Sequence, residues 1–283
     1  MSHPETVSTD RTGDRVPRTF WVGLVAVVVF VIVAAGLSNL VLALVQPDSP
    51  EAQFALQHFV SLPILVVAAF VFARWSGWWG DIWAPTSPDE SRRPRRLWML
   101  AIPVLMLVNP IGTLVDAPWG ERSTLFVVSL LAGCILIGVA EELTYRGILR
   151  VSLRAHHGEF LTVIVTALLF GLSHSLGSIL NGVPASIIAF QVAMTSLDGV
   201  FFYAAFIATR TLWVPIAIHA LTDFSLYVET GNTDAATGHG HELGPVGVTA
   251  QIVLGLLALV YVIGAARGDL RARRERKNGA TPA

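Results

Sequence analysis

Eight predominantly apolar stretches divide this chain, and each is long enough to cross a lipid bilayer as a helix. A spanning helix needs about 20 apolar residues, and it satisfies its backbone hydrogen bonds internally. Hydrophobic residues make up 53% of the chain and charged residues only 14%, whereas a soluble domain carries about 25% charged residues. The pattern predicts an all-α polytopic membrane protein and excludes a soluble globular domain. The expected spans are 20–45, 54–73, 97–115, 124–140, 160–180, 185–208, 212–228 and 246–266.

The basic residues predict an orientation for these spans. When the amino terminus is placed in the cytoplasm, all but one of the 19 Lys and Arg residues fall on the cytoplasmic side, and the exception is Arg122. This is the distribution that the positive-inside rule describes. The sequence therefore predicts eight transmembrane helices with both termini in the cytoplasm. The expected location is the plasma membrane, with the lipid bilayer as partner and no nucleic acid.

The domain organisation follows from the same pattern. We expect a disordered cytoplasmic amino terminus at 1–19, amino-terminal membrane helices within 20–122, and a distinct core at 123–228. The last span, 246–266, leads into a basic cytoplasmic tail at 267–283, which is also expected to be disordered.

The single cysteine, Cys134, excludes an intramolecular disulfide framework and a cysteine-based zinc site. The oligomeric state cannot be predicted.

Two adjacent glutamates, Glu141 and Glu142, follow the apolar stretch 124–140 directly. One carboxylate inside the membrane costs about 2.5–3.5 kcal/mol on insertion scales, so such residues are expected to face a polar site or to find a partner. Arg146 lies four residues after Glu142, on the same helix face, and can neutralise it. Glu141 shares its face with Tyr145 and has no local cation. We expect this helix to continue through Arg154, which would place the pair deeper in the membrane.

Two later spans add polar side chains where such groups are expensive. His174 lies well inside the stretch 160–180, and His219 lies one turn before Asp223 in 212–228. Residues four apart on a helix share a face, so His219 and Asp223 suit a common site. Together with Glu141, these groups come from three separate spans, and a bundle recovers their insertion costs by bringing them together.

This set of side chains suits hydrolysis. A carboxylate and an imidazole can remove a proton from water as it attacks a carbonyl, and a second imidazole can stabilise the oxyanion that forms. The same side chains are also normal zinc ligands, with one position left for water. The residue types leave both mechanisms open. The signatures HExxH, GxSxG and GxGD are absent from the sequence, so serine, site-2 zinc and aspartyl intramembrane protease mechanisms fit poorly.

Three motifs resemble those of the CPBP family, which contains the CAAX proteases and bacteriocin-processing enzymes. EELTYRG at 141–147 resembles the family motif EExxxR, FGLSH at 170–174 resembles FxxxH, and LWVPIAIHALTD at 212–223 resembles the stretch that ends in HxxxN/D. The motifs occur in family order. The resemblance implies an intramembrane endopeptidase, similar to the type II CAAX prenyl endopeptidase, with a cavity that opens to the cytoplasm.

The resemblance also implies residue roles. Glu141 and His174 would activate water, Glu142 and Arg146 would support them, and His219 with Asp223 would stabilise the oxyanion. The sequence departs from the eukaryotic-type enzymes at Asp223, where they carry asparagine, so this side chain would have to be protonated, orient His219 or hold a metal. A metal-free glutamate mechanism is favoured. If zinc is used, the ligands expected are Glu141, His174, His219 and Asp223. The expected substrate is a peptide or protein at the membrane, prenylated or not.

Two other kinds of function use the same residues. A membrane scaffold or immunity-type protein would keep the fold without turnover, and a separation beyond roughly 7 Å between Glu141 and His174 would favour it. A proton- or metal-coupled transporter would need a path open to both faces of the membrane.

Asp198, near the middle of the stretch 185–208, is a further acid, for which a structural partner such as an arginine or a backbone group is expected. Its neighbour Gly199 indicates either a helix break or a close helix approach.

Overall fold

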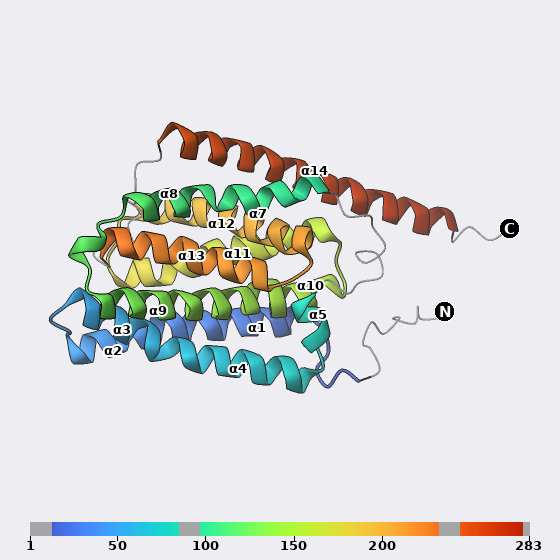
Figure 1. Ribbon diagram of the computed structural model, residues 1–283. Coiled ribbons are helices and arrows are strands. Elements are labelled where there is room, and N and C mark those ends of the chain that lie inside the picture. Colours follow the sequence, from blue (N-terminus) through green and yellow to red (C-terminus); the bar gives the residue numbers. More distant parts are fainter. Residues whose placement is uncertain (1–12, 85–96, 232–243, 280–283) are drawn as a thin grey trace.

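The computed structural model describes residues 13–84, 97–231 and 244–279, and in these ranges the chain forms helices and no strands. The long helices lie roughly parallel in one bundle (Figure 1). The first part contains α1 (Phe20–Val31), π-helical η1 (Ile32–Leu37), α2 (Ser38–Val45), α3 (Pro50–Phe59), α4 (Ser61–Ser76), α5 (Trp79–Trp83), 3-10 helix η2 (Leu97–Leu100), α7 (Ala101–Met106), α8 (Val108–Asp116) and 3-10 helix η3 (Trp119–Glu121). The second part contains α9 (Thr124–Glu142), π-helical η4 (Leu143–Leu149), α10 (Arg150–Arg154), α11 (Glu159–Leu180), α12 (Ala185–Thr209), α13 (Trp213–Thr230) and α14 (Pro245–Gly279).

Seven helical segments of the described residues are long and apolar enough to cross a membrane. They agree with seven of the eight expected spans, so the chain is an all-α multi-pass membrane protein. The exception is α13, which contains His219, Thr222, Asp223 and Ser225 within its 18 residues. Although it is the more polar helix, α13 packs along α9 and also contacts α8 and α12 (Figure 1). The cytoplasmic position of both termini stays a prediction.

The fourth span is continuous from Thr124 to Arg154, as expected from the sequence. It is not a uniform α-helix, because the seven residues of η4 form a π-helical segment directly after the glutamate pair. Segments of this kind are rare and occur often at functional sites. The fifth span agrees with the expected 160–180, since α11 runs from Glu159 to Leu180.

Two glycines allow the helices around this segment to approach closely. A Cβ atom on Gly138 of α9 would lie 2.8 Å from the Ile216 carbonyl oxygen of α13. A Cβ on Gly199 of α12 would lie 2.9 Å from the Cα of Ala167 in α11. Close helix approach, one of the two expectations for Gly199, is therefore confirmed, and α12 runs unbroken through this residue.

The described part of the amino terminus is ordered, so the expected disorder of 1–19 does not extend to residues 13–19; residues 1–12 lie outside the described ranges. The backbone N–H of Arg15 donates to the Ser76 carbonyl at 2.9 Å, and the Trp78 indole donates to the Val16 carbonyl at 3.1 Å. Arg18 forms an ion pair with Asp81 at 2.7 Å. These contacts hold the segment against the end of α4 and against α5, and composition alone does not reveal them.

The basic tail also differs from the expectation of disorder, because α14 continues as a helix to Gly279. The sequence after residue 266 is rich in Arg and Ala, which are good helix formers. Asp269 anchors this extension, since its carboxylate accepts hydrogen bonds from the backbone N–H groups of Glu159 and Phe160 at 3.1 and 2.9 Å. Residues 280–283 lie outside the described ranges.

At the opposite end of the bundle, Arg122 donates to the carbonyls of Val228 and Glu229 at 2.9 and 2.8 Å. These are among the last carbonyls of α13, where a cation is stabilising. The one basic residue that breaks the charge pattern therefore has a structural role.

Candidate active site

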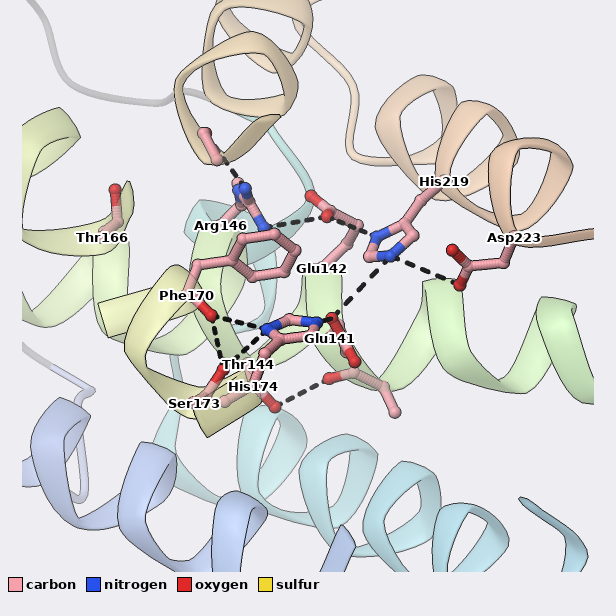
Figure 2. Close-up of polar contacts among 12 residues, drawn as sticks. Glu141, Glu142, Thr144, Arg146, Thr166, Phe170, Ser173, His174, His219 and Asp223 are labelled. Carbon is pink, nitrogen blue, oxygen red and sulfur yellow. Dashed lines mark hydrogen bonds and ion pairs between the residues drawn. The ribbon is translucent and has the colours of Figure 1, made fainter. Parts of the chain in front are cut away.

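The six residues expected to form a site lie together in the structure, although they come from three separate helical spans (Figure 2). Glu141 and Glu142 end α9, and Arg146 lies in η4. His174 projects from α11, and α13 contributes His219 and Asp223. The glutamates face two different sets of partners, and this division organises the site.

Glu142 and Arg146 form an ion pair whose side chains are both fully buried. Arg146 Nη1 donates to Glu142 Oε1 at 2.9 Å, and Nη2 donates to the Gly199 carbonyl of α12 at 3.0 Å. The guanidinium also lies over the Phe170 ring, 4.2 Å from its centroid. A buried charge pair is tolerated only with further hydrogen bonds of this kind. The predicted pair is confirmed, and it also ties α12 to the fourth span.

His219 is fixed by contacts on two sides of its ring. Its Nδ1 lies 2.9 Å from Glu142 Oε1, and since an ionised carboxylate only accepts hydrogen bonds, Nδ1 is the donor. The ring stacks on Phe202 of α12, with centroids 4.6 Å apart and planes 16° apart. Its Nε2 points towards Glu141 and Asp223, 3.8 Å from Glu141 Oε2 and 3.6 Å from Asp223 Oδ2.

His174 is oriented in a different way. Its Nδ1 lies 2.8 Å from the carbonyl oxygen of Phe170, one turn earlier, and must donate because a carbonyl only accepts. In the neutral imidazole, Nε2 is then an acceptor, and it lies 3.9 Å from Glu141 Oε2. The side chain is 31% exposed, more than the other imidazole of the site at 6%. His174 is therefore set up to accept a proton at Nε2.

Glu141 differs from its neighbour because its carboxylate makes no hydrogen bond with any described residue, whereas Glu142 Oε1 accepts from Arg146 and His219. The Oε2 atom of Glu141 is buried and unpaired. This oxygen lies 3.9 Å from His174 Nε2 and 3.8 Å from His219 Nε2. Both separations are too long for a direct hydrogen bond and are the kind that one water molecule bridges. A buried, unpaired carboxylate oxygen is costly to the fold, so its position indicates a use in binding or chemistry.

The expected zinc ligands do not form a ready metal site. In the described part of the chain, no group of three or more His, Cys, Asp or Glu side chains is arranged to hold a metal ion. Nδ1 of each histidine is engaged, by Glu142 in one case and by the Phe170 carbonyl in the other, an arrangement that metal-binding histidines share. Each ring is left with Nε2 alone.

Several residues of the site are supporting groups that the sequence did not identify as such. The backbone carbonyl of Phe170 orients His174, and the Phe170 ring packs against the guanidinium of Arg146. The ring of Phe202 stacks on His219. The sequence did contain a signal for Phe170, because this residue is the first position of the FxxxH motif. Phe202 and the Gly199 carbonyl had no signal, because their contacts depend on how α12 packs.

The expectation of a structural partner for Asp198 is wrong. Its carboxylate makes no hydrogen bond and no ion pair with the residues that the structure describes. It interacts electrostatically with His219, His174, Arg146 and Asp223, so it belongs to the surroundings of the site. The sequence located this acid in the membrane but did not connect it to the three motifs.

Comparison with known proteins identifies the same segment. Residues 123–225, just over a third of the chain, match the family model described as Type II CAAX prenyl endopeptidase Rce1-like. No curated protein and no solved structure matches the chain. The matched segment contains all six site residues, and it confirms the resemblance drawn from the motifs. The site therefore lies in the segment of this multi-pass membrane protein that is similar to the Rce1-like family.

Proposed function

We propose that this protein is an intramembrane endopeptidase that hydrolyses a peptide bond of a membrane-associated or lipidated protein or peptide. The observation that carries the proposal is the Oε2 atom of Glu141, which is buried, lacks a hydrogen bond to described residues and faces Nε2 of both histidines. The family match supports a peptidase. The proposed location is the plasma membrane, with the lipid bilayer as partner.

The nucleophile is a water molecule held between Glu141 Oε2 and His174 Nε2. Their separation of 3.9 Å suits a single bridging water. As the water oxygen bonds to the carbonyl carbon, its proton moves to the Glu141–His174 pair, which acts as general base. The same pair returns the proton to the amide nitrogen when the C–N bond breaks. The products are a carboxylic acid and an amine, which exchange a proton to become a carboxylate and an ammonium group, so atoms and protons balance.

His219 stabilises the oxyanion in this scheme. Nδ1 donates to Glu142, so only Nε2 can reach a reacting oxygen, and this atom must carry a proton to donate. Asp223 Oδ2, 3.6 Å from Nε2, assists by orienting the imidazole and by adding negative charge beside the imidazolium. Orientation of His219 is thus the role that we assign to the aspartate at the family's asparagine position.

Glu142 and Arg146 act as the support of this machinery, since they hold His219 without facing the water. The proposal contains no metal step, because Glu141 and His174 already suffice as a general base for water. A scaffold without turnover is less well supported, because Glu141 and His174 lie 3.9 Å apart and not beyond 7 Å.

The test is cleavage of a peptide library by the purified protein in lipid nanodiscs, with prenylated and unmodified peptides present. Glu141→Gln should abolish cleavage while insertion and the folded elution profile are kept. Glu121→Gln is the matched control, because Glu121 is exposed and lies in the short helix η3, outside the site. It should cleave at the wild-type rate.

A parallel series with a strong chelator separates the two mechanisms. Cleavage that persists with chelator and is absent in Glu141→Gln supports the glutamate mechanism. Loss with chelator and recovery with added zinc would overturn the metal-free proposal, and an active Glu141→Gln variant would overturn the role of Glu141.

A further inference from the structure

Asp198 lies on the face of α12 that borders the active site. It directly precedes Gly199, whose carbonyl accepts a hydrogen bond from Arg146 at 3.0 Å. It also lies one turn before Phe202, whose ring stacks on His219. Residues four apart share a helix face, so the face that carries Asp198 is the one turned to His219. The electrostatic interactions of its carboxylate with His219 and His174 agree with this placement.

This carboxylate has no visible structural purpose. Within the described residues it makes no hydrogen bond and no ion pair, and its side chain is partly exposed rather than sealed into the packing. The proposed hydrolysis does not use it either, because water activation and oxyanion binding are assigned to other residues. An intramembrane acid is expensive, and such residues usually mark a path or site for a ligand.

The charge of the site indicates which ligand group Asp198 can receive. Four carboxylates, those of Glu141, Glu142, Asp198 and Asp223, surround one guanidinium, that of Arg146. With His174 neutral and His219 as the imidazolium, the formal charge is −2. Inside a low-dielectric site, a neutral or acidic substrate side chain leaves this charge uncompensated, whereas a cation offsets it. Glu142 is already paired with Arg146, whereas the Asp198 carboxylate, on the side of α12 that faces the site, has no hydrogen bond or ion pair with a described residue.

We propose that Asp198 is a specificity-determining residue that binds a lysine or arginine side chain of the substrate close to the scissile bond. The inference rests on the proposed peptidase function and deepens it by naming a substrate class, peptides with a basic residue beside the cleavage site. An ion pair with the substrate also accounts for an acid that lacks a partner in the protein itself.

The test uses a cleaved library peptide remade as a matched set, with Lys, Gln or Glu at each position within three residues of the cut. The wild type should cleave the best Lys peptide with at least tenfold higher kcat/KM than its Gln counterpart. In Asp198→Asn this ratio should fall towards one, mainly through a higher KM for the Lys peptide. Asp198→Lys should reverse the order and favour Glu over Lys. Asp48→Asn is the control of equal charge change, because Asp48 is exposed in the α2–α3 turn and should keep the wild-type ratio.

Binding to the Glu141→Gln variant tests the inference without turnover. Fluorescence anisotropy should give a Kd for the labelled Lys peptide at least tenfold below that of the Gln peptide, and the added Asp198→Asn change should remove the difference. Equal kcat/KM for Lys and Gln peptides at every position, or a preference that survives Asp198→Asn, would overturn the inference while leaving the peptidase proposal intact. Charge-selective binding without any cleavage by the wild type would overturn the peptidase proposal and leave the binding role of Asp198 intact.

Discussion

One oxygen of Glu142 holds His219 in place: Oε1 lies 2.9 Å from His219 Nδ1 and accepts from the guanidinium of Arg146 at the same distance. The fourth span and α13 are therefore joined by a charged contact that is closed off from solvent, with both carboxylate and guanidinium fully buried. This contact separates the two glutamates by role, since Glu142 Oε1 is engaged with two protein groups and the Glu141 carboxylate has no hydrogen bond to a described residue.

The first prediction concerns the cost of breaking this ion pair. Arg146→Met leaves Glu142 buried without its cation, and such a change costs about 3–5 kcal/mol. Unfolding in detergent, followed by near-ultraviolet circular dichroism, should show this loss. The double variant Glu142→Gln, Arg146→Met should recover part of it, and Arg271→Met, at an exposed position of α14, is the control. A loss below about 1 kcal/mol in Arg146→Met would contradict the structure.

The second prediction concerns His174 as part of the general base. Its side chain is 31% exposed and makes one backbone hydrogen bond through Nδ1, so His174→Gln should change stability little. Loss of a positioned base should lower kcat by about 10²–10⁴-fold. Steady-state kinetics on a cleaved peptide, with thermal unfolding in parallel, measures both. A kcat within tenfold of the wild type would remove His174 from the proposed base.

The third prediction concerns the close approach of α11 and α12. In Gly199→Ala, the added methyl would lie 2.9 Å from the Cα of Ala167, so the helices must move apart. Overpacking of this kind costs about 1–3 kcal/mol. Gly177→Ala is the matched control, because a Cβ there meets nothing within 4 Å and should stabilise α11 by up to about 1 kcal/mol. Equal unfolding temperatures for the two variants would contradict the packing.

The fourth prediction concerns Tyr145, whose side chain is fully buried in η4. Its hydroxyl makes no hydrogen bond of normal geometry with the described residues, although Ser173 lies beside it. The ring packs edge-on against Phe170 and Phe30, contacts that phenylalanine would keep. Tyr145→Phe should therefore stabilise the fold by about 1 kcal/mol. A lower unfolding temperature for this variant would show that the hydroxyl has a partner in the folded protein.

The site residues themselves were predictable, because their chemistry is visible in the chain. Glutamates, histidines and an aspartate in apolar spans are expensive wherever the helices lie, so they are expected to meet. The i, i+4 spacing of Glu142 and Arg146 also fixes a contact within one helix, and the ion pair forms as expected. The supporting groups Phe202 and the Gly199 carbonyl were not predictable, since they belong to a helix whose register against α13 and η4 is set by packing.

The sequence by itself determined the class of the fold, the order of its spans and the six residues of the site, since apolar length and the cost of buried charge act on each segment separately. Only the tertiary structure decided which partner each group obtains: Glu142 is closed off by Arg146 and His219, Glu141 Oε2 is left to face both imidazoles, and Asp198 is left without a partner among the described residues. It also decided that the chain around residues 13–19 and 267–279 is ordered. These outcomes depend on contacts between residues far apart in the chain, which helix packing selects and local sequence does not encode.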